Sequence, residues 1–222
     1  MKQKIFGVTV AKLTASFGQT IYMVGLSLFF GAILGILLAL VLVLCRKGGL
    51  KENRIVYGIV STFVNIVRSV PFVILIVTIM PLTRAIMGTT IGSTAALAPL
   101  IFYISPYMAR LVENSLLEVS DGIIEAARAM GATTFQTVWN FLLPEALGSI
   151  VLALTTGTIG LLGASAMAGY VGGGGIGDLA LTYGYQKFNT PLMIFTVVIL
   201  IIVVQLLQAL GNGLSRRLRE HN

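Results

Sequence analysis

The sequence is poor in the residues that build most catalytic and metal sites. Its 222 residues include one cysteine, Cys45, and one histidine, His221. A single cysteine excludes an intramolecular disulfide and a cysteine-rich metal site. A single histidine excludes a histidine metal cluster, and its place at position 221 disfavours a Ser-His-Asp triad. The sequence therefore indicates neither an enzyme active site nor a metal centre in this chain.

Charged residues are also scarce, at 10% of the chain, whereas 56% of the residues are hydrophobic and the mean hydropathy is +0.95. This composition is typical of integral membrane proteins. The net charge of +7 could suggest nucleic acid as a partner. However, residues 110–145 are net −3, so the rest of the chain carries +10, in clusters beside apolar segments. That distribution is typical of membrane flanks and disfavours a nucleic-acid-binding face.

Five apolar segments predict an all-α polytopic membrane protein with five transmembrane helices in the lipid bilayer. The predicted spans cover about 19–44, 56–80, 91–108, 147–168 and 192–210. Residues 1–17 would precede them as a separate segment, interpreted as an interfacial helix. A cleaved signal peptide ending near Cys45 is the alternative, but the uncharged segment 13–45 is far longer than a signal-peptide core.

The Lys and Arg residues predict the orientation of these spans. An external N-terminus and a cytoplasmic C-terminus place nine basic residues inside and five outside. Residues 212–222 would then form a cytoplasmic tail. The same orientation places the charged segment 118–144 in the cytoplasm.

Polar residues in the second predicted span are candidates for a transport path. Pro71 has no N–H to donate to the Val67 carbonyl, so we expect a kink there. An arginine at the centre of a span costs about 2.5–3.5 kcal/mol on insertion scales, so Arg68 should face protein or water. The alternative is that Arg68 extends to the lipid headgroups. Asn65 and Ser69 complete this candidate set.

The fourth predicted span, 147–168, is rich in small residues, which suit either tight packing or a path wall. Ser165 and Met167 are path candidates near its end, with plain packing as the alternative for Met167. After it, Gly172–Gly177 formally contains GxGxxG, but no strand precedes it as a dinucleotide site requires. We therefore expect a flexible loop there.

Residues 118–144 are too densely charged for lipid and are predicted to lie in water between two spans. Asp121 is predicted to cap a first short helix, which Gly131 would end in a left-handed turn. Thr133 and Gln136 match a capping box that would open a second helix ending before Pro144. Isolated on the aqueous side, the first helix suits docking to a partner; a helix lying on lipid headgroups is the alternative. Its predicted apolar face consists of Ile123, Ile124, Ala127 and Met130.

The spacing in this segment resembles the EAA loop of bacterial ATP-binding-cassette (ABC) importer permeases. The pattern EAA-x3-G-x9-I-x-L-P matches from Glu125 to Pro144, except that Phe141 replaces the usual isoleucine. The stretches 65–72, 109–118 and 172–185 resemble the methionine (including D-methionine) importer permeases in particular. The resemblance implies the type I importer permease fold over 18–211, with coupling to an ATPase through Ile123, Ile124, Glu125, Ala126, Ala127, Met130, Gly131 and Pro144.

The family also implies the partners. Its permeases form homodimers in the bacterial cytoplasmic (inner) membrane, and each subunit inserts its EAA helix into one of two ATPase subunits. ATP and Mg²⁺ would bind that ATPase, because this chain has no Gly-x4-Gly-Lys-Ser/Thr phosphate loop and no cofactor site of its own. An extracytoplasmic methionine-binding protein or lipoprotein would deliver the substrate for alternating-access transport. Import of another amino acid or small organic solute, and a passive channel, are the alternative functions.

Overall fold

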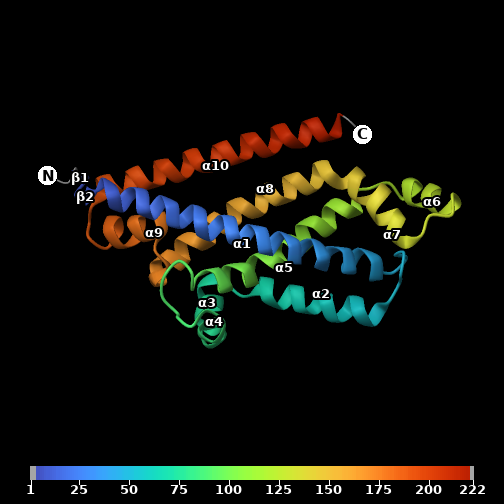
Figure 1. Ribbon diagram of the computed structural model, residues 1–222, viewed down its shortest axis with the longest axis horizontal. Coiled ribbons are helices and arrows are strands. Elements are labelled where there is room, and N and C mark those ends of the chain that lie inside the picture. The colour runs from blue at the N-terminus through green and yellow to red at the C-terminus, as the bar shows by residue number, and fades with distance from the viewer. Residues whose placement is uncertain (1–3, 221–222) are drawn as a thin grey trace. The chain divides into compact units, whose positions relative to one another are not determined.

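The computed structural model describes residues 4–220, and these residues are mostly helical (Figure 1). The long helices account for most of the predicted spans, and short π-helical segments (η) lie before and after some of them. In chain order the elements are β1 (Lys4–Ile5), β2 (Val8–Thr9), α1 (Val10–Cys45), α2 (Arg54–Ser69), α3 (Phe72–Thr78), α4 (Met80–Met87), α5 (Leu97–Leu117), α6 (Asp121–Ala129), α7 (Thr134–Thr137), η1 (Val138–Leu142), α8 (Leu143–Ala168), η2 (Gly169–Gly173), α9 (Gly175–Asp178), η3 (Leu179–Tyr185) and α10 (Thr190–Arg219).

The chain divides into two compact units, and each is described by itself. The first unit comprises Met1–Gly31, Val70–Ile104 and Thr158–Leu207. The second unit comprises Ala32–Ser69, Ser105–Gly157 and Gln208–Asn222. The long helices α1, α5, α8 and α10 each contribute residues to both units.

Among the described residues, three helical segments are long and apolar enough to cross a membrane: α1, the continuous helical segment 134–168, and α10. Helices α2 and α3 qualify together, as a bent pair. Helix α5 corresponds to the third predicted span, but it carries Arg110 and Glu113 and does not meet the same criterion. Length and composition thus give three or four spans, and the count of five remains a prediction.

The second predicted span is broken at Pro71. Helix α2 ends at Ser69, and α3 begins at Phe72 with Pro71 immediately before it. The missing N–H and the ring of Pro71 exclude a continuous helix here. The Ser69 hydroxyl donates to the Asn65 carbonyl at 2.8 Å, so the last residue of α2 bonds back onto its own helix. The predicted span 56–80 is therefore interrupted, not merely kinked.

In the first unit, the N-terminal segment forms a hairpin, which corrects the predicted interfacial helix over 1–17. Ile5 pairs with Val8 across a two-residue turn in which Phe6 and Gly7 have φ of 48° and 81°. Positive φ at both central residues is the geometry of a type I′ hairpin turn. Residues 10–17 are the first turns of α1, and residues 1–3 lie outside the described part of the chain.

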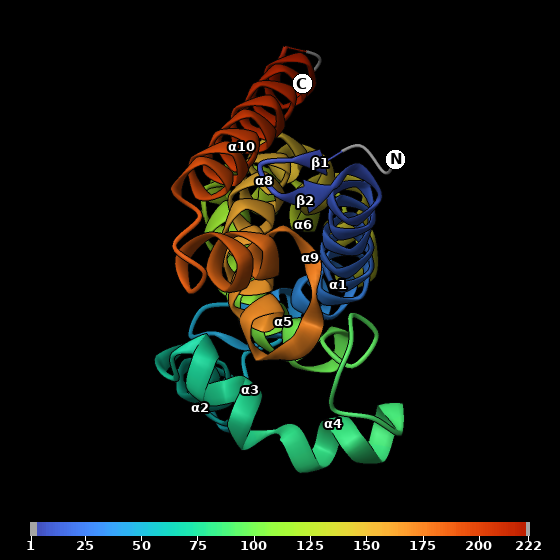
Figure 2. The same ribbon diagram turned by 90° about the vertical axis from the view of Figure 1, so that its left-hand side faces the viewer.

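The predicted flexible loop over 172–177 is also corrected, because this segment packs inside the first unit (Figure 2). The N–H of Gly175 donates to Gln19 Oε1 and the N–H of Ile176 donates to Thr20 Oγ1, both at 2.9 Å. Gly177 lies so close to Ala166 that a β-carbon would overlap its backbone. The glycines therefore permit close backbone packing and do not mark a mobile loop.

The second unit has an apolar core made where α1, α5, η1 and α8 meet. Met108 of α5 is fully buried against Gly35 of α1 and Gly157 of α8. A β-carbon at either glycine would overlap Met108, so the small residues allow the three helices to approach closely. The core cluster consists of Ala39, Val43, Val112, Leu116, Val138, Leu142, Ala146, Ile150 and Ala153.

Candidate functional site

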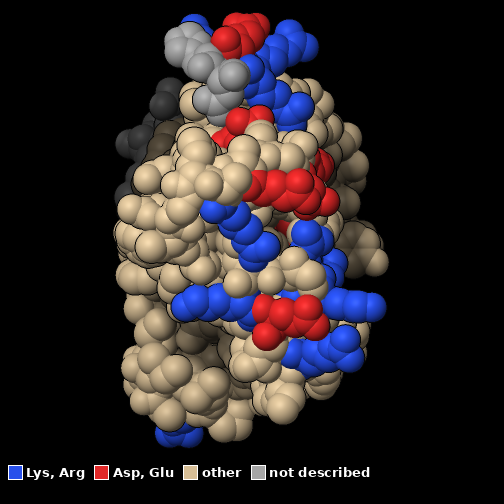
Figure 3. Space-filling model, turned by 90° about the vertical axis from the view of Figure 1, so that its right-hand side faces the viewer, with Lys and Arg blue, Asp and Glu red and all other residues tan. Residues whose placement is uncertain are grey.

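The charged residues concentrate in the second unit, which contains every Asp and Glu of the chain except Asp178. Figure 3 shows acidic and basic side chains gathered on one face of the molecule. The segment 118–144, termed the coupling loop below, belongs to this unit and supplies four of these charges. The candidate site is therefore built around this loop.

The first helix of the coupling loop is α6, and its start differs from the prediction. Ser120 occupies the N-cap position without a side-chain hydrogen bond, and Asp121 is the first residue of the helix. Asp121 therefore does not cap α6, but its charge lies in the first turn and that of Arg128 in the last. Both charges have the sign that complements the helix dipole.

The turn after α6 has the predicted geometry. Gly131 has φ of +81°, and its N–H donates to the Arg128 carbonyl at 2.9 Å. The capping box that follows is complete: the Gln136 N–H donates to Thr133 Oγ1 at 3.3 Å, and the Thr133 N–H donates to Gln136 Oε1 at 2.9 Å. These bonds fix the direction in which the chain leaves the turn.

Pro144 does not end the second helix, which corrects the prediction. The helix that starts at Thr134 passes through the π-helical turn η1 into α8 and continues to Ala168. The Leu143 N–H bonds to the Val138 carbonyl, five residues back, at the end of this turn. The wider turn accommodates a proline that has no N–H and whose ring would clash with the carbonyl four residues earlier. The second helix of the coupling loop is thus continuous with a candidate membrane span.

The predicted apolar face of α6 divides between the core and the surface. Ala127 is buried and Ile124 packs against the core of the second unit, whereas Met130 is 69% exposed. Ile123 and Pro144 are partly buried, and Glu125, Ala126 and Gly131 are exposed. The eight predicted coupling residues therefore share one loop, but only some of them are accessible to a partner.

Sequence reasoning missed the largest accessible apolar residues of the coupling loop. Phe135 and Trp139 are 71% and 54% exposed, and their ring centroids are 5.9 Å apart. We call them the aromatic pair. The available signal was the presence of two large aromatic residues, four positions apart, in a segment predicted to lie in water. Exposed aromatic residues are frequent anchors of protein–protein interfaces.

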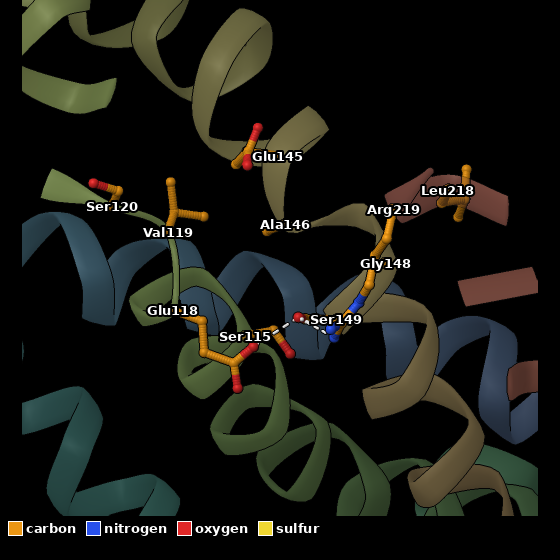
Figure 4. Close-up of a pocket in the computed structure, with 10 residues that line it drawn as sticks. All are labelled: Ser115, Glu118, Val119, Ser120, Glu145, Ala146, Gly148, Ser149, Leu218 and Arg219. Atoms are coloured by element: carbon orange, nitrogen blue, oxygen red, sulfur yellow. Dashed lines mark hydrogen bonds between the residues drawn. The ribbon is translucent and has the colours of Figure 1, made fainter. Parts of the chain in front are cut away.

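A polar cavity of about 370 Å³ lies beside the coupling loop (Figure 4). Within it, the Ser149 hydroxyl of α8 donates to Glu118 Oε2 at 2.7 Å and accepts from Arg219 Nη2 at 3.0 Å. Figure 4 shows these side chains converging from the end of α5, from α8 and from the end of α10. Glu145 also lines the cavity. Among the described residues, no group of three or more Asp, Glu, His or Cys side chains is arranged to hold a metal ion.

A second polar cluster joins α5 to α2 within the same unit. Arg110 forms an ion pair with Glu113 at 2.6 Å, and their side chains are only 16% and 5% exposed. Arg110 also donates to the Ser61 hydroxyl and to Asn65 Oδ1, the latter at 3.0 Å. The pairing of Arg110 with Glu113 follows from their spacing in the sequence, whereas the contact with α2 does not.

The six transport-path candidates are not gathered into one site within either unit. Asn65, Arg68 and Ser69 belong to the second unit, and Pro71, Ser165 and Met167 belong to the first. Asn65 accepts from Arg110, and the Arg68 guanidinium lies 5.9 Å from the centroid of the Tyr107 ring. Ser165 is buried and donates to the Leu162 carbonyl, whereas Met167 is 47% exposed. Of the fourth-span candidates, Met167 is therefore the accessible one.

Comparison with protein families shows which family the chain belongs to. Residues 31–220 match the family described as binding-protein-dependent transport system inner membrane component. The chain belongs to this family. Its members are membrane permease subunits, in agreement with the several long apolar helices of the fold.

Individual members of the permease family resemble the chain over most of its length. A protein named probable D-methionine transport system permease protein MetI, from Vibrio cholerae serotype O1, is 47% identical over 92% of this chain and 91% of its own. The methionine import system permease protein MetP of Bacillus subtilis is 40% identical over 77% of both chains. The fold is similar to that of a chain in the inward-facing MetNI methionine ABC transporter, with 44% identity, coverage of 94% and 97%, and a TM-score of 0.92.

A more distant structure supports the fold alone. A chain of an amino acid ABC transporter, crystallised with histidines, covers 93% of this chain and 94% of its own with a TM-score of 0.76, at 21% identity. Together with the methionine transporter, it establishes the type I importer permease fold expected from the EAA loop.

Proposed function

We propose that this chain is the permease subunit of an ATP-driven importer of methionine. The observation that carries the proposal is the 44% identity to the methionine transporter chain, with a TM-score of 0.92 over nearly the whole of both chains. At this similarity the two chains share the entire helical framework, so a shared transport function is the simplest inference. The relatives named as methionine or D-methionine permeases support the same substrate class.

The proposed assembly is a homodimer of permeases with two ATPase subunits and an extracytoplasmic methionine-binding protein or lipoprotein. ATP and Mg²⁺ would bind the ATPase subunits, and this chain would not hydrolyse ATP. The coupling loop supports such docking because it presents Met130 and the aromatic pair to solvent. It also presents charged residues of both signs, which would orient a complementary partner.

The proposed transmission of force follows from the helix continuity. If ATP binding draws the two ATPase subunits together, a docked loop moves with them. Helices α7, η1 and α8 form one uninterrupted segment, so this displacement reaches the fourth predicted span without a flexible linker. The hydrogen bonds of Ser149 with Glu118 and Arg219 link the displaced end of α8 to α5 and α10. Several spans would therefore move together between inward and outward openings.

The orientation is part of the proposal. We place the chain in the bacterial cytoplasmic membrane with its N-terminus outside and with the coupling loop and C-terminus in the cytoplasm. The distribution of Lys and Arg supports this orientation, and so does the need for the coupling loop to reach an ATPase on the side where ATP is present.

Transport in reconstituted vesicles tests the proposal. The permease, its ATPase and the binding protein are incorporated together, and uptake of labelled methionine is followed with and without ATP. We expect ATP-dependent uptake that unlabelled L- or D-methionine inhibits and other amino acids do not. Preferential inhibition by another amino acid would reassign the substrate, whereas rapid uptake without ATP would indicate a passive channel.

A further inference from the structure

A basic cavity lies where the first and last long helices begin, within the first unit. Its volume is about 440 Å³, which falls in the range of ordinary ligand pockets. It lies between the N-terminal hairpin and the segment that leads into α10. The residues that define it include Lys4, Val8, Lys12, Tyr183, Lys187 and Asn189.

Two of the lysines in this cavity share one aromatic ring. Lys12 Nζ lies 3.5 Å from the centroid of the Tyr183 ring, and Lys187 Nζ lies 4.1 Å from the same centroid. Because both ammonium groups contact one ring, their positive charges are held close together. Each ammonium is attracted to the face of the ring.

The chain supplies little negative charge to balance these lysines. Among residues 4–220, neither Lys12 nor Lys187 forms an ion pair, and none of the residues that line the cavity is acidic. The sequence has no Asp or Glu at all in residues 1–51 or 179–219. The cavity therefore concentrates positive potential and suits an anion that comes from outside the chain.

The surroundings of the cavity favour a membrane lipid over a soluble anion. Phe188 is 91% exposed although it has φ of 54°, an uncommon backbone conformation for a bulky residue. Phe6, at the tip of the hairpin, is 47% exposed and lies 5.5 Å from Phe195 of α10 between ring centroids. Tyr185 is 65% exposed. Exposed aromatic residues beside lysines, at the start of two membrane-length helices, are typical of the headgroup region.

The hairpin is itself fixed against the start of α10. Asn189 Nδ2 donates to the Phe6 carbonyl at 2.7 Å, and Val8 is buried with Leu179 and Leu192. The lysines of the hairpin and of the η3–α10 segment are thus held in one place by tertiary contacts. The cavity is a formed feature of the fold and not an accidental approach of long side chains.

We propose that this cavity binds the phosphate headgroup of an anionic phospholipid. Lys4, Lys12 and Lys187 would surround the phosphate. Phe6 and Phe188 would lie at the boundary between the lipid headgroups and the acyl chains. A bound lipid would then fix the hairpin and the starts of α1 and α10 at the membrane surface. The inference is independent of the transported substrate and of the orientation of the chain.

Lipid titration of the purified permease–ATPase complex, followed by native mass spectrometry, tests this proposal. We expect tighter binding of phosphatidylglycerol than of phosphatidylcholine. The double variant Lys12→Gln/Lys187→Gln should weaken phosphatidylglycerol binding by roughly fivefold for each lysine. The variant Lys47→Gln/Lys51→Gln removes the same charge from the loop after α1 and should leave binding at this site unchanged. Lys12→Arg/Lys187→Arg, which keeps both charges, should retain the preference.

Three outcomes would overturn the proposal. In the first, the Lys12/Lys187 and Lys47/Lys51 double variants lose the same affinity for phosphatidylglycerol. Lipid binding would then depend on the net charge of the protein and not on this cavity. In the second, millimolar inorganic phosphate displaces the lipid, so the cavity is a site for a free anion. In the third, the Lys12/Lys187 glutamine variant binds the lipid normally but loses affinity for the binding protein, so the basic surface serves that protein instead. An unchanged unfolding temperature and normal co-purification of the ATPase in each variant show that the fold is intact.

Discussion

Arg110 of α5 donates a hydrogen bond to the side-chain oxygen of Asn65 on α2, at 3.0 Å, while it is paired with Glu113. The two helices are thereby joined through a cation that is largely removed from solvent. Such a pair costs free energy to desolvate, and removal of one partner leaves the other charge buried and uncompensated. A substitution that removes one charged member of this cluster should therefore lower the stability of the protein.

We expect Arg110→Ala to destabilise the protein by about 3–5 kcal/mol, because it leaves the Glu113 carboxylate buried without its partner. The double variant Arg110→Met/Glu113→Leu should be clearly more stable than Arg110→Ala, because no charge remains buried. Thermal unfolding of the purified complex, monitored by size-exclusion chromatography, measures both. Equal unfolding temperatures for the two variants would show that the pair lies in a more solvated environment.

Gly157→Ala should destabilise by about 1–3 kcal/mol through overpacking against the buried side chain of Met108. In a Met108→Ala background, Gly157→Ala should cost less than in the native chain, because the overlap involves the end of the methionine side chain. Gly35→Ala should not be relieved in the same way, because it also approaches the Ser105 carbonyl at 3.0 Å. Unfolding temperatures of the single and double variants decide whether the two glycines behave differently.

Gly131→Glu is expected to abolish coupling while leaving membrane insertion intact. Among the described residues, no other atom lies within 4 Å of a β-carbon at residue 131, so the penalties are the φ of +81° and the bulk presented to a docked partner. Gly131→Asn, which tolerates this conformation, should retain most uptake. Gly88→Glu is the matched control, since Gly88 has φ of +72° and is equally open. If both glutamate variants transport normally, the docking position of Gly131 is wrong.

Arg68→Ala should lower methionine uptake and substrate-stimulated ATPase activity without affecting co-purification of the ATPase. Arg68 lies over the Tyr107 ring, a contact of about 0.5–1 kcal/mol at an exposed position. Arg68→Lys should restore activity only partly, because lysine lacks the planar guanidinium. Tyr107→Phe keeps an aromatic face and should be milder than Tyr107→Leu. Normal transport by Arg68→Ala would favour a headgroup anchor.

Cysteine labelling with an impermeant reagent tests the orientation. In a Cys45→Ser background, Thr89→Cys should be labelled from outside intact cells, and Lys51→Cys only after the cells are opened. Both positions are exposed, and neither lies at a glycine with positive φ. The opposite pattern would place the coupling loop outside, where an ATPase could not be supplied with ATP.

Local sequence signals determined much of the coupling loop. The left-handed turn at Gly131 and the capping box of Thr133 with Gln136 depend on residues within three positions of each other, so the pattern predicted them correctly. The missing N–H of Pro71 likewise predicted a bend between α2 and α3. Pro106 lies inside α5 without ending it, so a proline alone does not determine a complete break. The family was also predicted from a local pattern, the EAA spacing, and the family match over residues 31–220 confirms it.

Only the tertiary structure decided how these elements are used. Pro144 looked like a helix end, but packing of Val138 and Leu142 in the core favours a π-helical turn that carries the helix through it. Gly172–Gly177 looked mobile, yet the backbone of this segment bonds to Gln19 and Thr20, more than 150 residues away. Neither outcome is determined by the neighbours in the sequence alone. Both depend on which distant side chains reach the segment once the helices have packed, and a local pattern holds no information about that.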